Sequence, residues 1–415
     1  MPIRTFDPVT QRWAAQPTAD YQHGQWVTPT QKGIPGVIYR SPLDPDHYLG
    51  TGTVWQRDVR GDAMPLAHNS AVLATWMWEK TPNPFNNNGA FGAKTSLNTS
   101  VFGTQPIPVW LIASSVPGCP TRKMVGAGGT TRRDIVNGDI PCPPMAVDSG
   151  NHDHGMAIWD LGTGVMREYF YVVSNRLKSG STTEYEDFDL AKDSAEMRAA
   201  TGGFSINHQF LNDLAVTNYA TQIDGSSAVA AMHNELGFIG ASEIRAGRLN
   251  HALAFTTANF ASRKPASWPA SMSDGKAPST EISPTHGQWA RLPASVDPMH
   301  NPRTGQPYNP LTRLIIEAAK RYGLVGTDTN AWCHAFNGEH GAPEKAATGI
   351  DPWSDQGDLK RALVPYGDTT DAFNVSDFPW DLTEWAPVDW GRPSPDFHVR
   401  PSEFKPWTRP EGSTP

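Results

Sequence analysis

The chain has 415 residues, a mass of 45.3 kDa, 37 glycines, 37 prolines and 18% charged residues. Few charges combined with 15 Trp, 10 Tyr and 16 Phe exclude an intrinsically disordered chain, whose composition is the reverse. The net charge of −8 and the lack of a long basic run exclude a nucleic-acid-binding protein, which clusters cations to neutralise phosphates.

No targeting or membrane segment is predicted. The first residues lack the charged segment and apolar run of a secretory leader. The best candidate for a membrane span, residues 71–78, falls far short of the roughly 20 apolar residues that cross a bilayer. We therefore expect no membrane insertion, and either a protein made in the cytoplasm or a mature form without its leader.

Composition divides the chain into three parts. Residues 1–60 carry prolines and glycines throughout without a sustained periodicity, which predicts an irregular attachment segment. Residues 61–345 carry the strand and helix signals of a compact domain.

Several stretches of the central part predict strands. The first is residues 107–113, an apolar run bounded by prolines. Residues 155–160 and 165–173 flank a glycine-containing loop and predict a β-hairpin, because the second arm is rich in aromatic and β-branched residues. In residues 249–257, His251 shares one strand face with leucines and a phenylalanine, so a hydrogen-bonded core histidine is expected.

Few helices are predicted. The clearest covers residues 311–322, with Asn309 as N-cap, Pro310 at the first position, an apolar stripe and Gly323 as the stop. A shorter helix around residues 242–246 ends at Gly247. Strands that dominate over one or two packed helices predict a mainly β fold, arranged as a β-sandwich.

The C-terminal part, residues 346–415, changes character. From residue 350 onward it holds ten prolines and five of the 15 tryptophans. Such a segment is not expected to form a regular sheet or helix. It is expected to lie extended as an arm that anchors a tryptophan every few residues, on its own domain or on a neighbouring subunit.

The most distinctive polar motif is NHDHGM at residues 151–156, at the entrance of a predicted strand. His152 and His154 share a strand face, which suits a metal, although no third and fourth ligands are evident. A hydrogen-bonded strand entrance and a sugar site are the other interpretations, and all three stay open. No cofactor is expected, because P-loop, HExxH, GxSxG and dinucleotide motifs are absent.

Aromatic and carboxylate side chains beside this motif predict a glycan-binding surface, because rings stack on sugar CH faces and carboxylates bind hydroxyls. A solvated sheet face has the same pattern. The candidate residues are Asp153, His154, Trp159, Glu168, Tyr169 and Tyr171. If they converged, His154, Glu168 and His251 would also supply the acid and base of a glycan lyase or hydrolase.

The three cysteines, Cys119, Cys142 and Cys333, are too few for a disulfide framework. No zinc-type Cys/His spacing occurs. Two interpretations stay open, a bridge between Cys119 and Cys142 or reduced thiols packed as small apolar groups.

Three motifs resemble a group of actinobacterial proteins, and they follow one another along the chain in the same order as in that group. They are GFIGASEIRAGRLNHALAF at residues 237–255, the DHGM, DLGTG and EY groups within residues 153–169, and the segment at residues 289–330 that includes the long helix. The resemblance covers about half of the chain. Its members are secreted actinobacterial proteins of unclear activity and minor tail proteins of phages that infect these bacteria.

The resemblance implies a jelly-roll or lectin-like β-sandwich, similar to carbohydrate-binding modules and polysaccharide lyases. The missing leader favours the phage branch, since virion proteins assemble in the host cytoplasm. We therefore expect a virion structural protein, a minor tail (tail-tip) subunit that contacts other tail proteins and the host envelope polysaccharide, and forms a homo-oligomer. A polysaccharide lyase or glycoside hydrolase acting on the same glycan, and a purely architectural subunit, are the alternatives.

Overall fold

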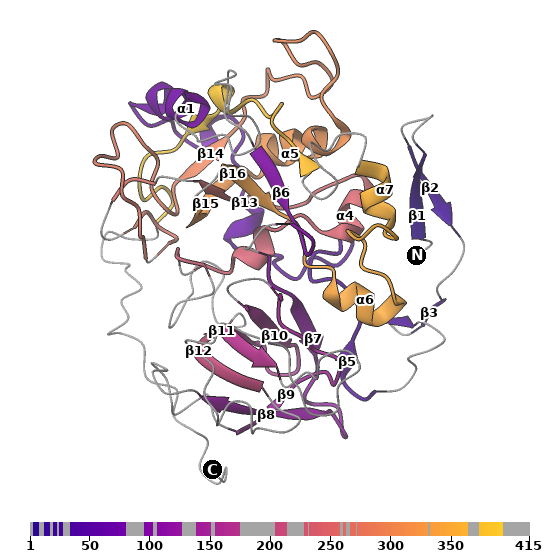
Figure 1. Ribbon diagram of the computed structural model, residues 1–415. Helices are drawn as coiled ribbons and strands as arrows, with labels where there is room; N and C mark the ends of the chain where they lie inside the picture. The colour runs from indigo at the N-terminus through magenta and orange to yellow at the C-terminus, as the bar shows by residue number, and fades with distance from the viewer. Residues whose placement is uncertain are drawn as a thin grey trace.

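The computed structural model describes seventeen segments of the chain. They are residues 3–7, 12–16, 20–22, 25–27, 34–79, 95–102, 106–126, 138–150, 154–174, 204–213, 228–230, 232–257, 260–262, 266–270, 272–330, 333–363 and 373–392. Two seven-stranded sheets dominate this part of the chain, and Figure 1 shows one above the other. The predicted mainly β fold is therefore confirmed.

The first sheet, sheet I, lies in the lower half of Figure 1. Its central hairpin is the predicted one, with Asp160 opposite Val165 at the turn. In spatial order its strands are β5 (Val37–Ile38), β7 (Val109–Ile112), β10 (Met156–Asp160), β11 (Val165–Ser174), β12 (Phe204–Asp213), β8 (Thr121–Gly126) and β9 (Gly138–Pro141).

The second sheet, sheet II, is built from strands that lie far apart in the sequence. In spatial order they are β17 (Phe373–Asn374), β6 (Thr95–Asn98), β16 (His334–Asn337), β13 (Leu253–Thr257), β15 (Leu324–Thr329), β14 (Trp289–Arg291) and β18 (Glu384–Trp385). Both sheets are mixed, because β10–β7, β12–β8, β13–β15 and β16–β6 are parallel pairs. Two separate hairpins precede them, β1 (Ile3–Asp7) with β2 (Arg12–Gln16) and β3 (Asp20–Gln22) with β4 (Gln25–Val27).

The two sheets share an apolar core. Leu111 and Trp159 of sheet I belong to the same buried cluster as Ala254, Val325 and Trp289 of sheet II. Neighbouring side chains of a strand point to opposite faces of its sheet. Ala254 of β13 therefore faces this shared core, whereas Leu253 and Phe255 belong to a different cluster on the other face. Each sheet therefore turns one face toward the common core.

Five α-helices lie in the described residues, more than the one or two expected. The predicted helix is confirmed as α5 (Pro310–Arg321), and the Asn309 side chain caps it by accepting from the Thr312 amide at 2.8 Å. The shorter predicted helix is α4 (Ala241–Ala246), which ends at Gly247 with φ of 71°. The sequence analysis missed α1 (Ser70–Glu79), α6 (Ala342–Thr348) and α7 (Asp358–Leu363).

The missed helices carry weak sequence signals for a physical reason. Leu73 and Met77 of α1 are fully buried, but apolar residues occur around the whole helix, so no stripe marks it. Helices α6 and α7 are only seven and six residues long, too short for a periodic pattern. The described residues also form short 3₁₀ helices at η1 (Val54–Gln56), η2 (Gly61–Ala63), η3 (Asn234–Gly237) and η5 (Trp380–Leu382).

The N-terminal part also departs from the expected boundary at residue 60. Leu43 and Trp55 are each 1% exposed and belong to the inter-sheet core. Strand β5 pairs with β7 at the edge of sheet I. Residues 34–60 are therefore an integral part of the two-sheet fold.

The described residues of the C-terminal segment are also integral to the fold, and the expected lack of regular structure is wrong for them. Strand β17 pairs with β6 at one edge of sheet II and β18 pairs with β14 at the other, so residues 373–385 run as a strap from edge to edge. The strap buries Trp380 completely, and its indole N–H donates to Thr95 Oγ1 at 2.7 Å. Trp353 and Trp385 are equally buried in the same apolar cluster, and Trp390 packs edge-on against Trp289 at 6.1 Å, so four of the five tryptophans pack within this chain.

The strap is also tied to α5. Asp377 accepts hydrogen bonds from the Asn309 amide at 2.9 Å and from the Thr312 hydroxyl. Asn309 is the N-cap of the helix, so one carboxylate joins the strap to the helix start. Burial raises the pKa of Asp377, although these donors favour its charged form.

We predict that Trp380→Ala lowers the free energy of unfolding by about 3–5 kcal/mol, because it removes a large buried ring and leaves a cavity. Chemical denaturation followed by circular dichroism measures this loss. Leu66→Ala, at a position that is 47% exposed, is the control and should change stability by less than about 0.5 kcal/mol. Equal effects of the two substitutions would contradict the strap's role.

Candidate functional site

The six predicted glycan-binding residues do not form one surface. Asp153 lies outside the described residues, as does the side chain of Tyr171 in β11. Ala157 pairs with Glu168 and Met156 pairs with Tyr169, so the two β11 side chains point to opposite faces of sheet I. Trp159 belongs to the inter-sheet core, whereas Tyr169 belongs to the cluster on the outer face.

Burial excludes the rings from sugar stacking. Trp159 is 5% exposed, and Tyr169 and Glu168 are 0% exposed. Glu168 Oε1 instead lies 3.8 Å from His233 Nδ1, within the protein. The expected aromatic platform at Trp159 and Tyr169 is therefore wrong, because apolar clusters cover both faces of sheet I.

His154 is the one predicted residue with a described side chain that is partly exposed. Its Nδ1 lies 2.8 Å from Asp148 Oδ2, and the His154 and Asp148 side chains are 15% and 0% exposed. The backbone of His154 has φ of 44°, the left-handed region that non-glycine residues seldom adopt. A buried carboxylate at Nδ1 orients the imidazole, as in sites where histidine binds polar ligands or moves protons.

His340 extends this polar group toward α6. Its Nε2 lies 3.2 Å from the Ser149 carbonyl, and its Nδ1 accepts from the Ala342 amide at 3.2 Å. Burial lowers the pKa of His340, although the carboxylates of Asp351 and Asp148 act in the opposite direction. The neutral His340 ring thus joins the entrance of β10 to the start of α6. We call the group of His154, Asp148 and His340 the His154 rim.

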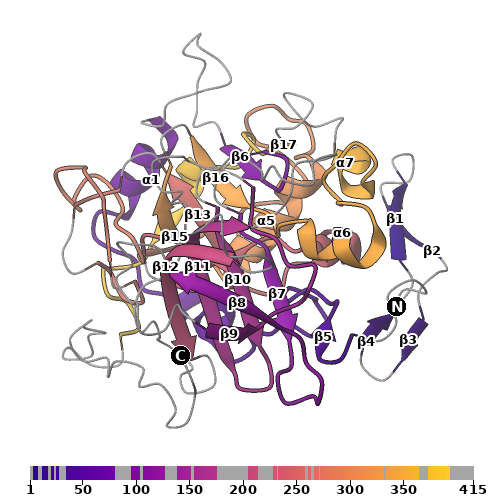
Figure 2. The ribbon, with the colours of Figure 1, turned by 60° about the horizontal axis from the view of Figure 1, so that its bottom comes forward.

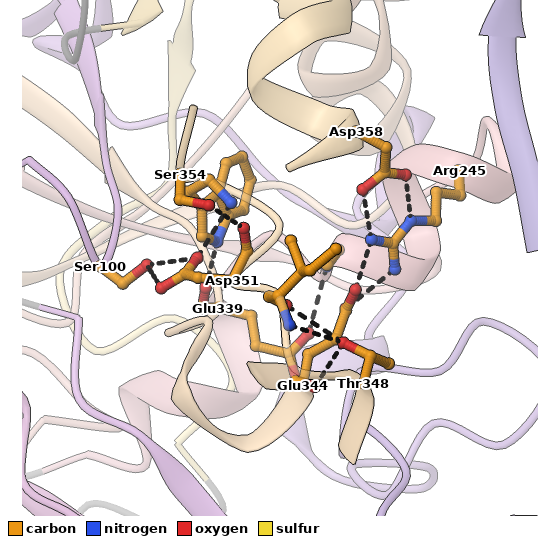
Figure 3. Close-up of polar contacts among 11 residues, drawn as sticks. Ser100, Arg245, Glu339, Glu344, Thr348, Asp351, Ser354 and Asp358 are labelled. Atoms are coloured by element: carbon orange, nitrogen blue, oxygen red, sulfur yellow. Dashed lines mark hydrogen bonds and ion pairs between the residues drawn. The ribbon is translucent and has the colours of Figure 1, made fainter. Parts of the chain in front are cut away.

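Figure 3 shows a network of carboxylates around α6. Asp351 accepts from the Ser100 hydroxyl at 2.7 and 2.9 Å. Arg245 of α4 donates to Glu344 of α6 and to Asp358 of α7, with two hydrogen bonds to each carboxylate. Burial disfavours the guanidinium charge, but the two carboxylates outweigh it and raise the pKa of Arg245. The network holds α4, α6 and α7 together. The carboxylates of Glu344 and Asp358 are both engaged by Arg245.

His251 is a core histidine, as predicted. It is fully buried, its Nε2 donates to Glu243 Oε2 at 3.0 Å, and its Nδ1 donates to the Ala252 carbonyl at 2.8 Å. Glu243 Oε2 also accepts from the Gly240 amide at 3.0 Å, which caps α4. The Tyr48 ring stacks on the imidazole with centroids 4.7 Å apart. This part of the 237–255 motif therefore builds a buried ion pair.

Asp160 of the DLGTG group has an equally structural role. It accepts from the Ser114 amide at 2.9 Å, the Gly162 amide at 3.0 Å and the Thr163 hydroxyl at 2.9 Å. Burial opposes the charge, but these donors outweigh it and lower the pKa of Asp160. The carboxylate closes the turn between β10 and β11.

The described part of the chain contains no group of three His, Cys, Asp or Glu side chains placed to hold a metal ion. Cys119, Cys142 and Cys333 are free thiols in the structure. Among the described helices, none has the length and apolar character that a membrane crossing requires. The sequence analysis missed Asp148 and His340 as partners of His154, because loop contacts leave no periodic signal.

We predict that the His251–Glu243 pair makes stability depend on pH. Burial disfavours the imidazolium, but Glu243 and the hydrogen bonds outweigh it and raise the pKa of His251 above its usual 6.5. The pair therefore stabilises the fold fully below a pH of about 6.5 and loses this contribution as the pH rises through the folded-state pKa.

Chemical denaturation of the wild type and of His251→Gln from about pH 5.5 to about pH 9 tests the prediction. The stability difference between them should be largest at the acidic end and shrink toward the alkaline end. Parallel pH profiles for the two proteins would contradict a charged imidazole in the folded state.

Comparisons of this chain with protein-family models, with curated proteins and with solved structures give no match to any of them.

Proposed function

We propose that the protein is a virion structural subunit, a minor tail (tail-tip) protein of a phage that contacts the host envelope glycan. The observation that supports a structural role is that the polar residues of the sequence motifs make contacts within the fold. Glu243 and His251 form a buried pair, Asp160 closes a turn, and Glu168 and Tyr169 are fully buried. The ordered resemblance to phage minor tail proteins supports the assignment to a tail.

The glycan contact is proposed at the His154 rim. His154 is partly exposed and its imidazole is held by Asp148, so it offers an oriented polar group to sugar hydroxyls. A single contact of this kind is weak, and repeated copies in a tail would convert it into avid attachment. Other tail proteins and further copies of this chain are the proposed partners.

The jelly-roll form of the sandwich is part of the same proposal. Jelly rolls are built from antiparallel Greek keys, whereas four neighbouring pairs of the described strands are parallel. We therefore propose a sandwich related to that class in its two packed sheets rather than in every strand connection.

A lyase or glycosidase that uses His154 and Glu168 is the weaker alternative. Such an enzyme needs an acid and a base on either side of one glycosidic bond. Glu168 lies on the inter-sheet side with His233, whereas His154 joins Asp148 at the entrance of β10. The two groups do not face one substrate position.

Co-sedimentation with insoluble host envelope polysaccharide tests the proposal. We expect the protein in the pellet and no released oligosaccharide in the supernatant. His154→Gln should weaken pelleting about tenfold, because it removes the imidazole that Asp148 orients, a change worth about 1.4 kcal/mol.

Tyr169→Phe is the matched control, since the Tyr169 hydroxyl is buried and finds no hydrogen-bond partner among the described residues. It should pellet like the wild type. Released sugar would support the enzymatic alternative. Unchanged pelleting of His154→Gln would refute the rim as the contact, and no pelleting at all would leave a purely architectural tail subunit.

A further inference from the structure

A surface turn on the sheet II side of the molecule brings a serine and an aspartate to a buried histidine. Ser273 Oγ lies 2.8 Å from His286 Nδ1. Asp274 Oδ1 lies 3.6 Å from His286 Nε2. The two consecutive residues therefore approach both nitrogens of one imidazole, and none of the three belongs to the motifs considered above.

The turn is held against the protein by its backbone. Ala277 and Phe260 are joined by a hydrogen bond of 2.9 Å from the Ala277 amide. Gly275 fits because a Cβ there would lie 2.4 Å from the Ala261 carbonyl oxygen. The Gly275 amide donates to Ser273 Oγ at 3.2 Å, which orients the hydroxyl. The serine is thus positioned by fixed chain segments.

The histidine is buried and neutral. His286 is 0% exposed and its ring centroid lies 4.2 Å from that of Phe260. Burial lowers the pKa of His286 to about 4, although Asp274 acts in the opposite direction. Asp274 is itself positioned by the Thr329 hydroxyl, which donates to Oδ1 at 2.5 Å.

The arrangement defines where the imidazole proton resides. Among the described residues, His286 Nε2 is buried without a hydrogen-bond partner, and the Asp274 carboxylate lies 3.6 Å from it. A carboxylate on that side favours the N–H at Nε2, so the Nδ1 lone pair accepts the Ser273 hydroxyl proton. Hydroxyl, imidazole and carboxylate in this order are the parts of a nucleophilic hydrolase site.

We propose that Ser273 is the nucleophile of an esterase site, with His286 as the base and Asp274 as a positioning residue. The neighbouring Met272 is 51% exposed, which offers an apolar contact to the acyl group. The substrate class is therefore a carboxylic ester with an aliphatic acyl chain. This activity is independent of the proposed glycan contact and uses different residues.

The reaction balances with water as the second reactant. Ser273 Oγ bonds to the ester carbonyl carbon while its proton moves to His286 Nδ1. The C–O bond to the alcohol then breaks, and the departing alcohol takes that proton. Water attacks the acyl-serine in the same way, giving its proton to Nδ1, and the carboxylic acid leaves as the serine hydroxyl is restored.

A fluorophosphonate probe and 4-nitrophenyl butyrate test the site in the full chain. Peptide mass spectrometry should find one adduct, on Ser273, and Ser273→Ala should lose the adduct and at least about tenfold of the butyrate hydrolysis. Ser242→Ala is the matched control, because Ser242 is a half-buried serine whose hydroxyl donates to the Leu43 carbonyl at 3.4 Å and lies outside the proposed site. It should retain both signals.

Asp274→Asn separates positioning from folding, since Asp274 is exposed. It should lower kcat several-fold at unchanged KM, with an unchanged melting temperature. The proposal is overturned if folded wild-type protein gives no Ser273 adduct, or if Ser273→Ala hydrolyses the ester at the wild-type rate.

Discussion

The burial of Trp380 is the contact on which sheet II depends. Its ring stacks on Phe336 at 5.7 Å and lies 5.2 Å from Phe255, so one side chain joins strands β16 and β13 through the strap. The strap that carries it supplies the strand at each edge of the sheet. Because the indole N–H is bonded to Thr95, the large apolar contact is made without leaving a buried donor unpaired.

This construction bears on function because the polar residues of the sequence motifs make contacts inside the fold. They are therefore not available to a binding or catalytic surface. The charged groups of the 237–255 motif cap α4 and hold His251 in the core. Arg245 joins three helices through two carboxylates, as Figure 3 shows. His154 and Ser273 are the two side chains with an oriented polar partner that carry our proposals. Figure 2 shows sheet I from below, with the entrance of β10 close to α6.

Local signals predicted the elements that depend on local interactions. Helix α5 has both a cap and an apolar stripe, and the β10–β11 hairpin has a glycine turn, so both were found in the sequence. The candidate site could not be predicted in this way. The alternation of side chains in β11 indicates which residues share a face, but it does not indicate that apolar clusters cover both faces. Tyr169 is buried by an outer cluster that includes Trp110 and Cys142. The contacts of His154 with Asp148 and of Ser273 with His286 arise from loop geometry, which has no period to detect.

Hydrogen exchange of the full chain, followed by mass spectrometry, tests most directly whether residues 373–385 are part of the fold. If the strap closes sheet II, the amides of Val375 in the strap and of Ala386 directly after it, which donate to the carbonyls of Thr95 and Trp289, should exchange only as fast as the whole sheet unfolds. They should then share the protection of β13. Exchange within seconds in this segment, with β13 still protected, would contradict the account and make the segment a detachable arm.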